Sequence, residues 1–243
     1  MAYTKPFPRV FLPMKYRDIL DDNEYLLDSR YVNKQESSSL VNAARIIIKD
    51  YYDLIDYVEP TNSNKDVYSH RIYELLLRTA TEFEANCKGV LLANGYTNCG
   101  NLNITDYCRL NTLMKLDEYE ISTQLWSPEK RFRPLEEWGL SHELTWYQAY
   151  NHAKHNRYQN FGEATLENLF NGICSLVVVL AAQFPNVIGF LGGDGLSFTS
   201  DDPRELIISS FTIKYPQFAE TDQYDFDWNV IKSVQEPFDK YNF

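Results

Sequence analysis

The sequence has few cysteines and none of the close cysteine pairs that form structural zinc sites or redox motifs. Its four cysteines stand at positions 87, 99, 108 and 174. The first 20 residues carry prolines at 6, 8 and 13 and charges throughout, so they lack the apolar stretch of a signal peptide. We therefore expect a reducing, cytoplasmic environment with free and mostly structural thiols, and neither a bound metal nor a cofactor.

The chain also lacks a hydrophobic run long enough to cross a bilayer. The most apolar stretch, LFNGICSLVVVLAAQF from Leu169 to Phe184, is shorter than the roughly 20 residues that a transmembrane helix needs. It is also interrupted by Asn171. This stretch predicts a buried helix of a protein core, and we expect no membrane partner.

Positive charge is the third scarce feature. The chain has 23 Lys and Arg against 34 Asp and Glu, which gives a formal net charge of -11. A broad electrostatic contact with DNA or RNA is disfavoured, because proteins that bind nucleic acids usually present a basic face. A local basic patch remains open, but the acidic tail after Asp201 is a poor candidate for it.

The length of 243 residues is enough for a full hydrophobic core in one elaborated domain. We predict a mainly α fold that is α+β in detail. An irregular, proline-rich and tyrosine-rich arm is expected over residues 1–36, followed by a helical bundle over 37–184. A hairpin near 118–136 interrupts the bundle, and residues 185–243 form a short-stranded elaboration on the same core.

Apolar residues recur at steps of three and four in several segments, and this periodicity predicts helices. The expected helices cover about 37–59, 66–93, 104–116, 141–157 and 164–184. Residues that favour strands flank Ser127-Pro128-Glu129-Lys130, which predicts the hairpin, and ELIISSFTIKYPQF near the C-terminus predicts an extended segment.

The segment TWYQAYNHAKHNRYQN, from Thr145 to Asn160, carries the main candidate site. On a helix, positions 144, 147, 151 and 155 form one line, so Asn151 and His155 continue a stripe that Leu144 and Tyr147 begin. A histidine on a semi-buried stripe can act as a general acid or base, and an amide one turn earlier can orient it. The alternative is that both side chains are buried and only satisfy the backbone by hydrogen bonds.

The spacing YNHAKH resembles the motif of HEPN domains, with Asn151 at the polar position and His155 at the histidine. Tyr150 stands where that family has an arginine, and Lys154 and Arg157 are the nearby cations. The resemblance covers about residues 66–184. It implies a helical bundle, a homodimer with a composite site, and metal-independent RNA cleavage in prokaryotic defence or toxin-antitoxin systems.

We therefore expect a HEPN-like protein that binds or cleaves RNA and is degenerate at the arginine position. Under this interpretation, Asn151 and His155 are the catalytic candidates, and Tyr150, Lys154 and Arg157 are the substrate-binding candidates. The rival hypothesis is a non-enzymatic helical interaction module that binds another protein.

Three other patterns are weaker candidates. His152 and His155 have the spacing to share a metal with His142 or Glu143, but exposed histidines explain them more simply. GGDG at 192–195 is more typical of a tight turn than of an anion cradle. The basic cluster EKRFR at 129–133 includes an aromatic residue and could contact RNA, although an exposed strand accounts for it as well.

Overall fold

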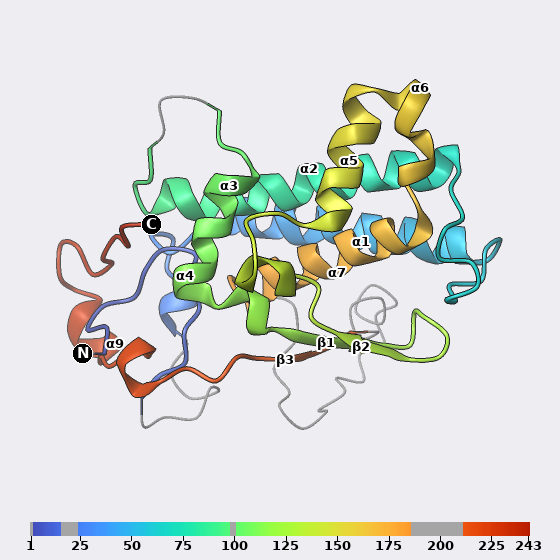
Figure 1. The fold of residues 1–243 in the computed structure, drawn as a ribbon. Helices are drawn as coiled ribbons and strands as arrows, with labels where there is room; N and C mark the ends of the chain where they lie inside the picture. The colour runs from blue at the N-terminus through green and yellow to red at the C-terminus, as the bar shows by residue number, and fades with distance from the viewer. Residues whose placement is uncertain (1, 16–23, 98–100, 186–210) are drawn as a thin grey trace.

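A computed structural model describes residues 2–15, 24–97, 101–185 and 211–243, and it shows a mainly α fold with one small sheet (Figure 1). The longer helices are α1 Lys34–Ile55, α2 His70–Ala93, α5 Thr145–His155 and α7 Leu166–Ala181. The short helices are α3 Ile104–Tyr107, α4 Asn111–Met114, α6 Arg157–Asn160 and α9 Trp228–Ile231. The strands are β1 Glu120–Thr123, β2 Lys130–Phe132 and β3 Phe211–Lys214.

Helix α7 forms the centre of the bundle. It packs on α2, α5 and α1, and it is buried along almost its whole length, as its apolar sequence predicted. A side chain at Gly172 would come within 3.1 Å of the Trp146 ring, so this glycine lets α5 lie close against α7. Within the described ranges, no helix is both long and apolar enough to cross a membrane.

Side-chain caps fix where the long helices begin. Asn33, Ser69 and Thr165 each accept a hydrogen bond from a backbone N–H in the first turn of α1, α2 and α7. The sequence predicted a start near residue 66. Because Ser69 is the cap, α2 begins at His70 instead. The helix expected over 104–116 is also broken into α3, a 3-10 turn and α4, and it ends where Lys115 adopts a φ of 50°.

The predicted hairpin is confirmed. Strands β1 and β2 pair antiparallel, with Ile121 opposite Phe132 and Thr123 opposite Lys130. Strand β3 pairs antiparallel with the other edge of β1, so the order in the sheet is β2-β1-β3. Of the extended segment predicted near the C-terminus, residues 205–210 lie outside the described residues, as does the GGDG sequence at 192–195.

The N-terminal arm and the C-terminal segment lie side by side, joined by aromatic packing (Figure 1). Tyr25 packs edge-on against Tyr224 and Phe226, with ring centroids 5.8 and 5.5 Å apart. The Tyr224 hydroxyl donates to the Val10 carbonyl over 2.9 Å and accepts a hydrogen bond from the Phe7 N–H. These contacts hold together segments from opposite ends of the sequence.

The arm also places a buried arginine at the end of the bundle. Arg9 is only 3% exposed, and its Nε and Nη2 donate to Oε1 of Gln183 over 3.0 and 2.8 Å. Its Nη1 donates to Glu36 at the start of α1 over 2.8 Å. Burial lowers the pKa of Arg9, and the neighbouring Glu36 opposes that shift. Gly89 leaves the space for the guanidinium, because a Cβ at that position would overlap it.

Replacement of Gln183 by Leu should strongly destabilise the fold, because the buried guanidinium loses the oxygen that accepts two of its hydrogen bonds. We expect the free energy of unfolding to fall by roughly 3 kcal/mol, measured by urea denaturation. The control is Gln124→Leu at an exposed position of the chain. Equal effects of the two substitutions would show that the buried contact contributes little.

Candidate functional site

Helix α5 carries the candidate site, and its buried face fixes its orientation. Trp146, Ala149, Tyr150 and Ala153 lie on this face, together with Tyr147. The Trp146 ring meets Phe83 of α2 edge-on at 5.1 Å between centroids. The expected semi-buried stripe through residues 144, 147, 151 and 155 holds as far as Asn151, which is half-buried, but it is wrong at His155, which is exposed.

A carboxylate holds the N-terminal end of α5. The residue before the helix, Leu144, has no side chain that could cap it, and Glu137 accepts hydrogen bonds from both the N–H and the hydroxyl of Thr145. A negative charge at this end also interacts favourably with the helix dipole. The start of α5 is thus fixed by a residue eight positions earlier in the chain.

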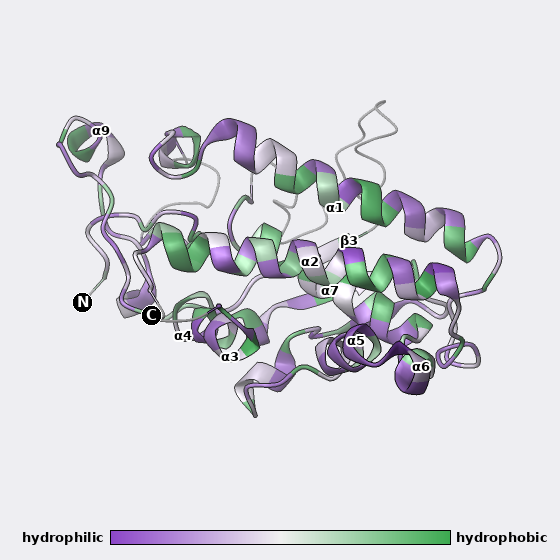
Figure 2. Cartoon of the chain, turned by 90° about the horizontal axis from the view of Figure 1, so that it is seen from above, coloured by the Kyte–Doolittle hydropathy of each residue, from purple (hydrophilic) through white to green (hydrophobic). Residues whose placement is uncertain are grey.

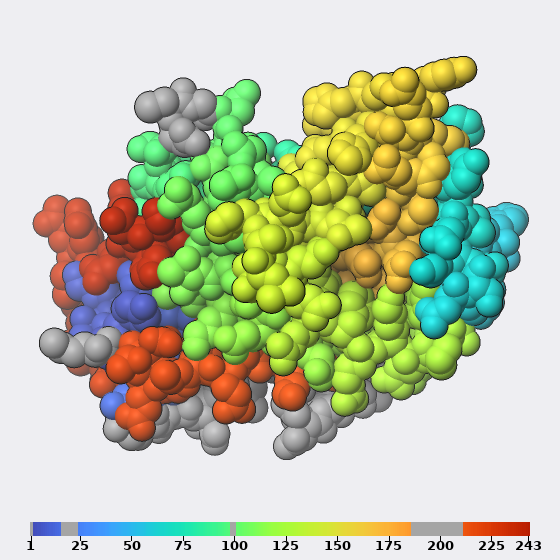
Figure 3. All heavy atoms as spheres, viewed as in Figure 1, coloured from blue at the N-terminus to red at the C-terminus, as the bar shows by residue number. Residues whose placement is uncertain are grey.

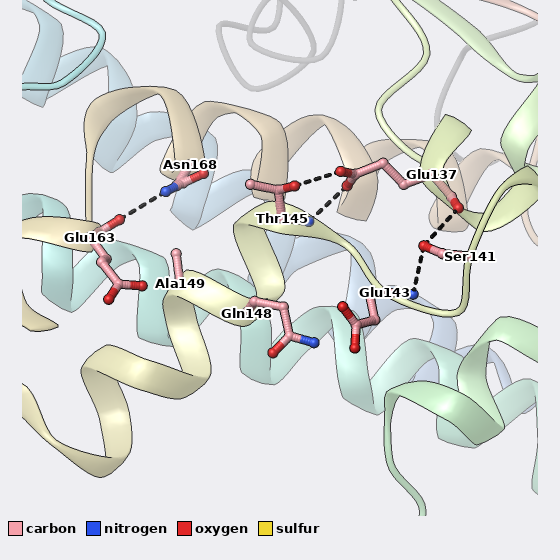
Figure 4. Close-up of a pocket in the computed structure, with 8 residues that line it drawn as sticks. All are labelled: Glu137, Ser141, Glu143, Thr145, Gln148, Ala149, Glu163 and Asn168. Carbon is pink, nitrogen blue, oxygen red and sulfur yellow. Dashed lines mark hydrogen bonds between the residues drawn. The ribbon is translucent and has the colours of Figure 1, made fainter.

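A pocket of about 350 Å³ opens beside this end of α5 (Figure 4). It is lined by Glu137, Ser141, Glu143, Thr145, Gln148, Ala149, Glu163 and Asn168. Three of these residues are glutamates and none is a lysine or an arginine, so the lining repels a phosphate group. This pocket is therefore a poor site for an anionic ligand.

At its other end α5 turns sharply into α6, and we call residues 154–160 the α5–α6 corner. The helix stops where Asn156 leaves helical geometry, with a φ of -140° and a ψ of 71°. The Asn156 N–H and the Asn160 side chain both donate to the carbonyl of His152, which holds the turn together. The corner projects from the bundle (Figures 1 and 3), and Figure 2 shows α6 in the colour of hydrophilic residues.

Phe161, directly after α6, anchors this corner to the start of α2. Its ring packs against Tyr68, His70 and Tyr73, with centroid distances of 5.5, 4.8 and 5.8 Å. A second tie joins His152 Nδ1 to Glu163 Oε2 over 2.8 Å. The corner is therefore exposed on its outer side and packed on its inner side.

Tyr150 lies beneath the corner and not on it. It is 3% exposed, and its hydroxyl lies 3.3 Å from Glu84, to which Tyr147 also donates over 2.7 Å. The Lys154 ammonium donates to the Tyr150 hydroxyl over 2.9 Å. Burial raises the pKa of Tyr150, and the hydrogen bond to Tyr150 raises the pKa of Lys154, so the lysine carries its charge at neutral pH.

The outer side of the corner combines cations, an imidazole and an aromatic ring. Lys154, His155 and Arg157 are exposed, and Tyr158 is 98% exposed. Arg157 lies over the ring of Tyr73, 5.9 Å from its centroid. Within the part of the chain that the structure describes, neither Lys154 nor Arg157 forms a salt bridge. The sequence from 144 to 162 contains no Asp or Glu, so positive charge prevails locally.

The predicted site residues thus separate into two groups. Lys154, His155 and Arg157 share the exposed corner, whereas Tyr150 is buried and contacts only Lys154 among the candidates. The side chains of Asn151 and His155 make no hydrogen bond to any described residue, so the alternative that they satisfy a buried backbone does not apply.

Two residues of the site were not among the sequence candidates. Tyr158 and Phe161 occupy the same irregular run of polar residues, yet one ring is exposed and the other is packed. The lack of an apolar period after Ala153 was a signal that an aromatic residue there could be exposed. Which ring would be exposed depends on the turn at Asn156, and the sequence pattern does not specify that turn.

The weaker candidates of the sequence are the basic hairpin and a metal site. Two cations of the hairpin have acidic partners, and the metal site lacks converging ligands among the described residues. In the hairpin, Lys130 pairs with Glu167 at 3.1 Å and lies over the rings of Trp126 and Phe132. Arg131 lies 3.8 Å from Glu120. Over the described ranges, no three His, Cys, Asp or Glu side chains converge as they would around a metal ion.

Comparisons with protein-family models, with curated proteins and with solved structures found no match for this chain. The resemblance to HEPN domains therefore stays a prediction. A function must be argued from the charges and side chains of the site itself.

Replacement of Glu137 by Ala should weaken the start of α5, because the Thr145 N–H loses its acceptor. We expect the free energy of unfolding to fall by about 1 kcal/mol in chemical denaturation. The matched control is Glu136→Ala, since the neighbouring glutamate is exposed. If the contact from Glu137 contributes nothing, the two variants will have the same free energy of unfolding.

Proposed function

We propose that this protein binds single-stranded RNA at the α5–α6 corner. The observation that carries the proposal is the exposure of Lys154, His155, Arg157 and Tyr158 together, without a salt bridge to either cation among the described residues. In a chain with a net charge of -11, a phosphate is attracted only where cations gather locally, as they do at this corner. An RNA ligand is also in keeping with the expected cytoplasmic location.

Single strands fit this corner better than duplexes. An unpaired base can stack on the exposed ring of Tyr158, while the two cations contact the adjoining phosphates. The bases of a duplex are stacked on one another, and binding to a duplex depends on a wider basic surface than two residues supply. The small number of cations predicts modest affinity with a clear dependence on salt.

The proposal extends to metal-independent cleavage, for which His155 is the candidate base. In such a reaction the base removes the proton of the 2′-hydroxyl, the oxygen attacks the adjoining phosphorus, and the bond to the 5′-oxygen breaks. A second group must protonate the leaving oxygen. His155 of a second copy can supply that proton, so a homodimer with two facing corners is part of the proposal. This arrangement keeps the HEPN-like interpretation and its link to defence or toxin-antitoxin systems.

Asn151 and Tyr150 have indirect roles in this scheme. Asn151 lies one turn before His155 on α5 and is half-buried, so it is a candidate to orient the RNA backbone or the imidazole. Tyr150 is buried and holds Lys154 through its hydroxyl. It therefore positions a cation and does not contact RNA directly.

The binding proposal predicts separable effects on affinity and on its salt dependence. Lys154→Gln and Arg157→Gln should each lower the slope of log K against log salt by about 0.7, because each removes one phosphate contact. Tyr158→Ala should weaken binding by about tenfold through lost stacking. Fluorescence anisotropy with a labelled single-stranded RNA measures both quantities.

Lys49→Gln is the control for this experiment, because Lys49 is an exposed cation on α1. It should change neither the affinity nor the slope appreciably. Equal effects of the Lys49, Lys154 and Arg157 substitutions would mean that binding is diffuse, and the corner would lose its special role.

The cleavage proposal predicts that purified protein cuts single-stranded RNA in the presence of EDTA. His155→Ala should reduce the rate by about a hundredfold or more, because a general base is lost. His152→Ala is the matched control, since this histidine on the same helix pairs with Glu163. Light scattering at micromolar concentration should detect a dimer. Cleavage that His155→Ala leaves unchanged would contradict the assignment.

The alternative of a non-enzymatic protein-interaction module is favoured by one feature. Leu140 is 89% exposed and adjoins Ser141 in the lining of the glutamate-rich pocket. An apolar residue beside a negatively charged hollow suits a basic peptide segment. Protein that binds no single-stranded RNA in the anisotropy experiment would favour this alternative.

A further inference from the structure

A thiol and an imidazole lie side by side at a place that does not involve the α5–α6 corner. Cys108 begins the 3-10 turn after α3, and His142 precedes α5. The His142 Nδ1 lies 3.3 Å from the Cys108 Sγ, although the residues are 34 positions apart. With its proton on Nε2, the ring can accept the thiol proton at Nδ1.

The other described cysteines have no such neighbour. Cys87 and Cys174 are fully buried, and burial raises the pKa of both thiols. Among the described residues, no histidine lies within hydrogen-bonding distance of either one. Cys108 is 6% exposed and is paired with an exposed histidine, so a proton that leaves its thiol has a route to solvent.

We propose that Cys108 is a modification site for small hydroperoxides, with His142 as the base that generates the nucleophile. The Cys108 thiol gives its proton to Nδ1 of His142, and the thiolate attacks one oxygen of the peroxide. The O–O bond breaks, sulfur is oxidised to a sulfenic acid, and the leaving oxygen takes the proton from His142. With hydrogen peroxide, the second product is water.

The surroundings of Cys108 make the histidine necessary. Burial and the nearby carboxylate of Asp117 both raise the pKa of the Cys108 thiol, so the thiol keeps its proton at neutral pH until a base removes it during the reaction. Reactivity at this position should therefore depend on His142 and not on the thiol alone. This dependence separates an activated thiol from one that is only accessible.

The experiment treats the native full chain with dilute hydrogen peroxide and a dimedone-type reagent, which traps sulfenic acids. Peptide mass spectrometry then gives the rate of labelling at each cysteine. Cys108 should react at least about tenfold faster than Cys87 and Cys174 in the wild type, and His142→Ala should slow it at least about tenfold at neutral pH. Cys108→Ser should remove this label.

The matched control is His152→Ala, which removes another exposed histidine, one that pairs with Glu163, and should leave the labelling rate of Cys108 unchanged. The unfolding midpoint of each variant shows whether the fold is retained. The wild-type comparison needs no variant at all. Labelling of Cys108 no faster than that of Cys87 and Cys174, or labelling that folded His142→Ala leaves unaltered, would overturn the proposal.

Discussion

The buried guanidinium of Arg9 is the contact on which the rest of the structure depends. A charge that is 3% exposed is tolerated only because Gln183 and Glu36 supply oxygens to it. Gln183 also donates to Asn86 of α2, and the Tyr31 hydroxyl donates to the Gln183 carbonyl. The pair of Arg9 and Gln183 thereby joins the N-terminal arm, α1, α2 and the segment after α7. This pair fixes the end of the bundle opposite the α5–α6 corner.

The two ends of α5 carry opposite charges. The glutamate-rich pocket lies beside its N-terminal end, and the cationic α5–α6 corner lies at its C-terminal end. Glu137 occupies the N-terminal end, where the helix dipole favours an anion, and Lys154 lies in the last turn, where it favours a cation. The dipole that stabilises Lys154 also repels a phosphate at the same end. Under the RNA-binding proposal, the charges of Lys154 and Arg157 must together outweigh the helix dipole at the corner. Arg157 lies beyond the end of α5.

Local periodicity was sufficient to predict α7, α2 and the hairpin, because each depends on neighbouring residues. It was insufficient for the orientation of α5. Leu144 and Tyr147 face the core, as the line 144–147–151–155 predicted, but His155 at the end of that line is exposed. The buried side of α5 continues instead through Ala149, Tyr150 and Ala153. The cap from Glu137 and the contact from Arg9 to Gln183 join distant segments, so no window of sequence contains them.

The burial of Tyr150 bears on the predicted resemblance to HEPN domains, which would place an arginine at this position. A side chain at position 150 points toward Glu84 and away from the exposed corner, so a cation there would pair with that carboxylate before it reached a phosphate. The tyrosine instead holds the Lys154 ammonium at 2.9 Å. Positive charge at the corner therefore comes from Lys154 and Arg157, and the hydroxyl of Tyr150 sets where one of these two charges lies.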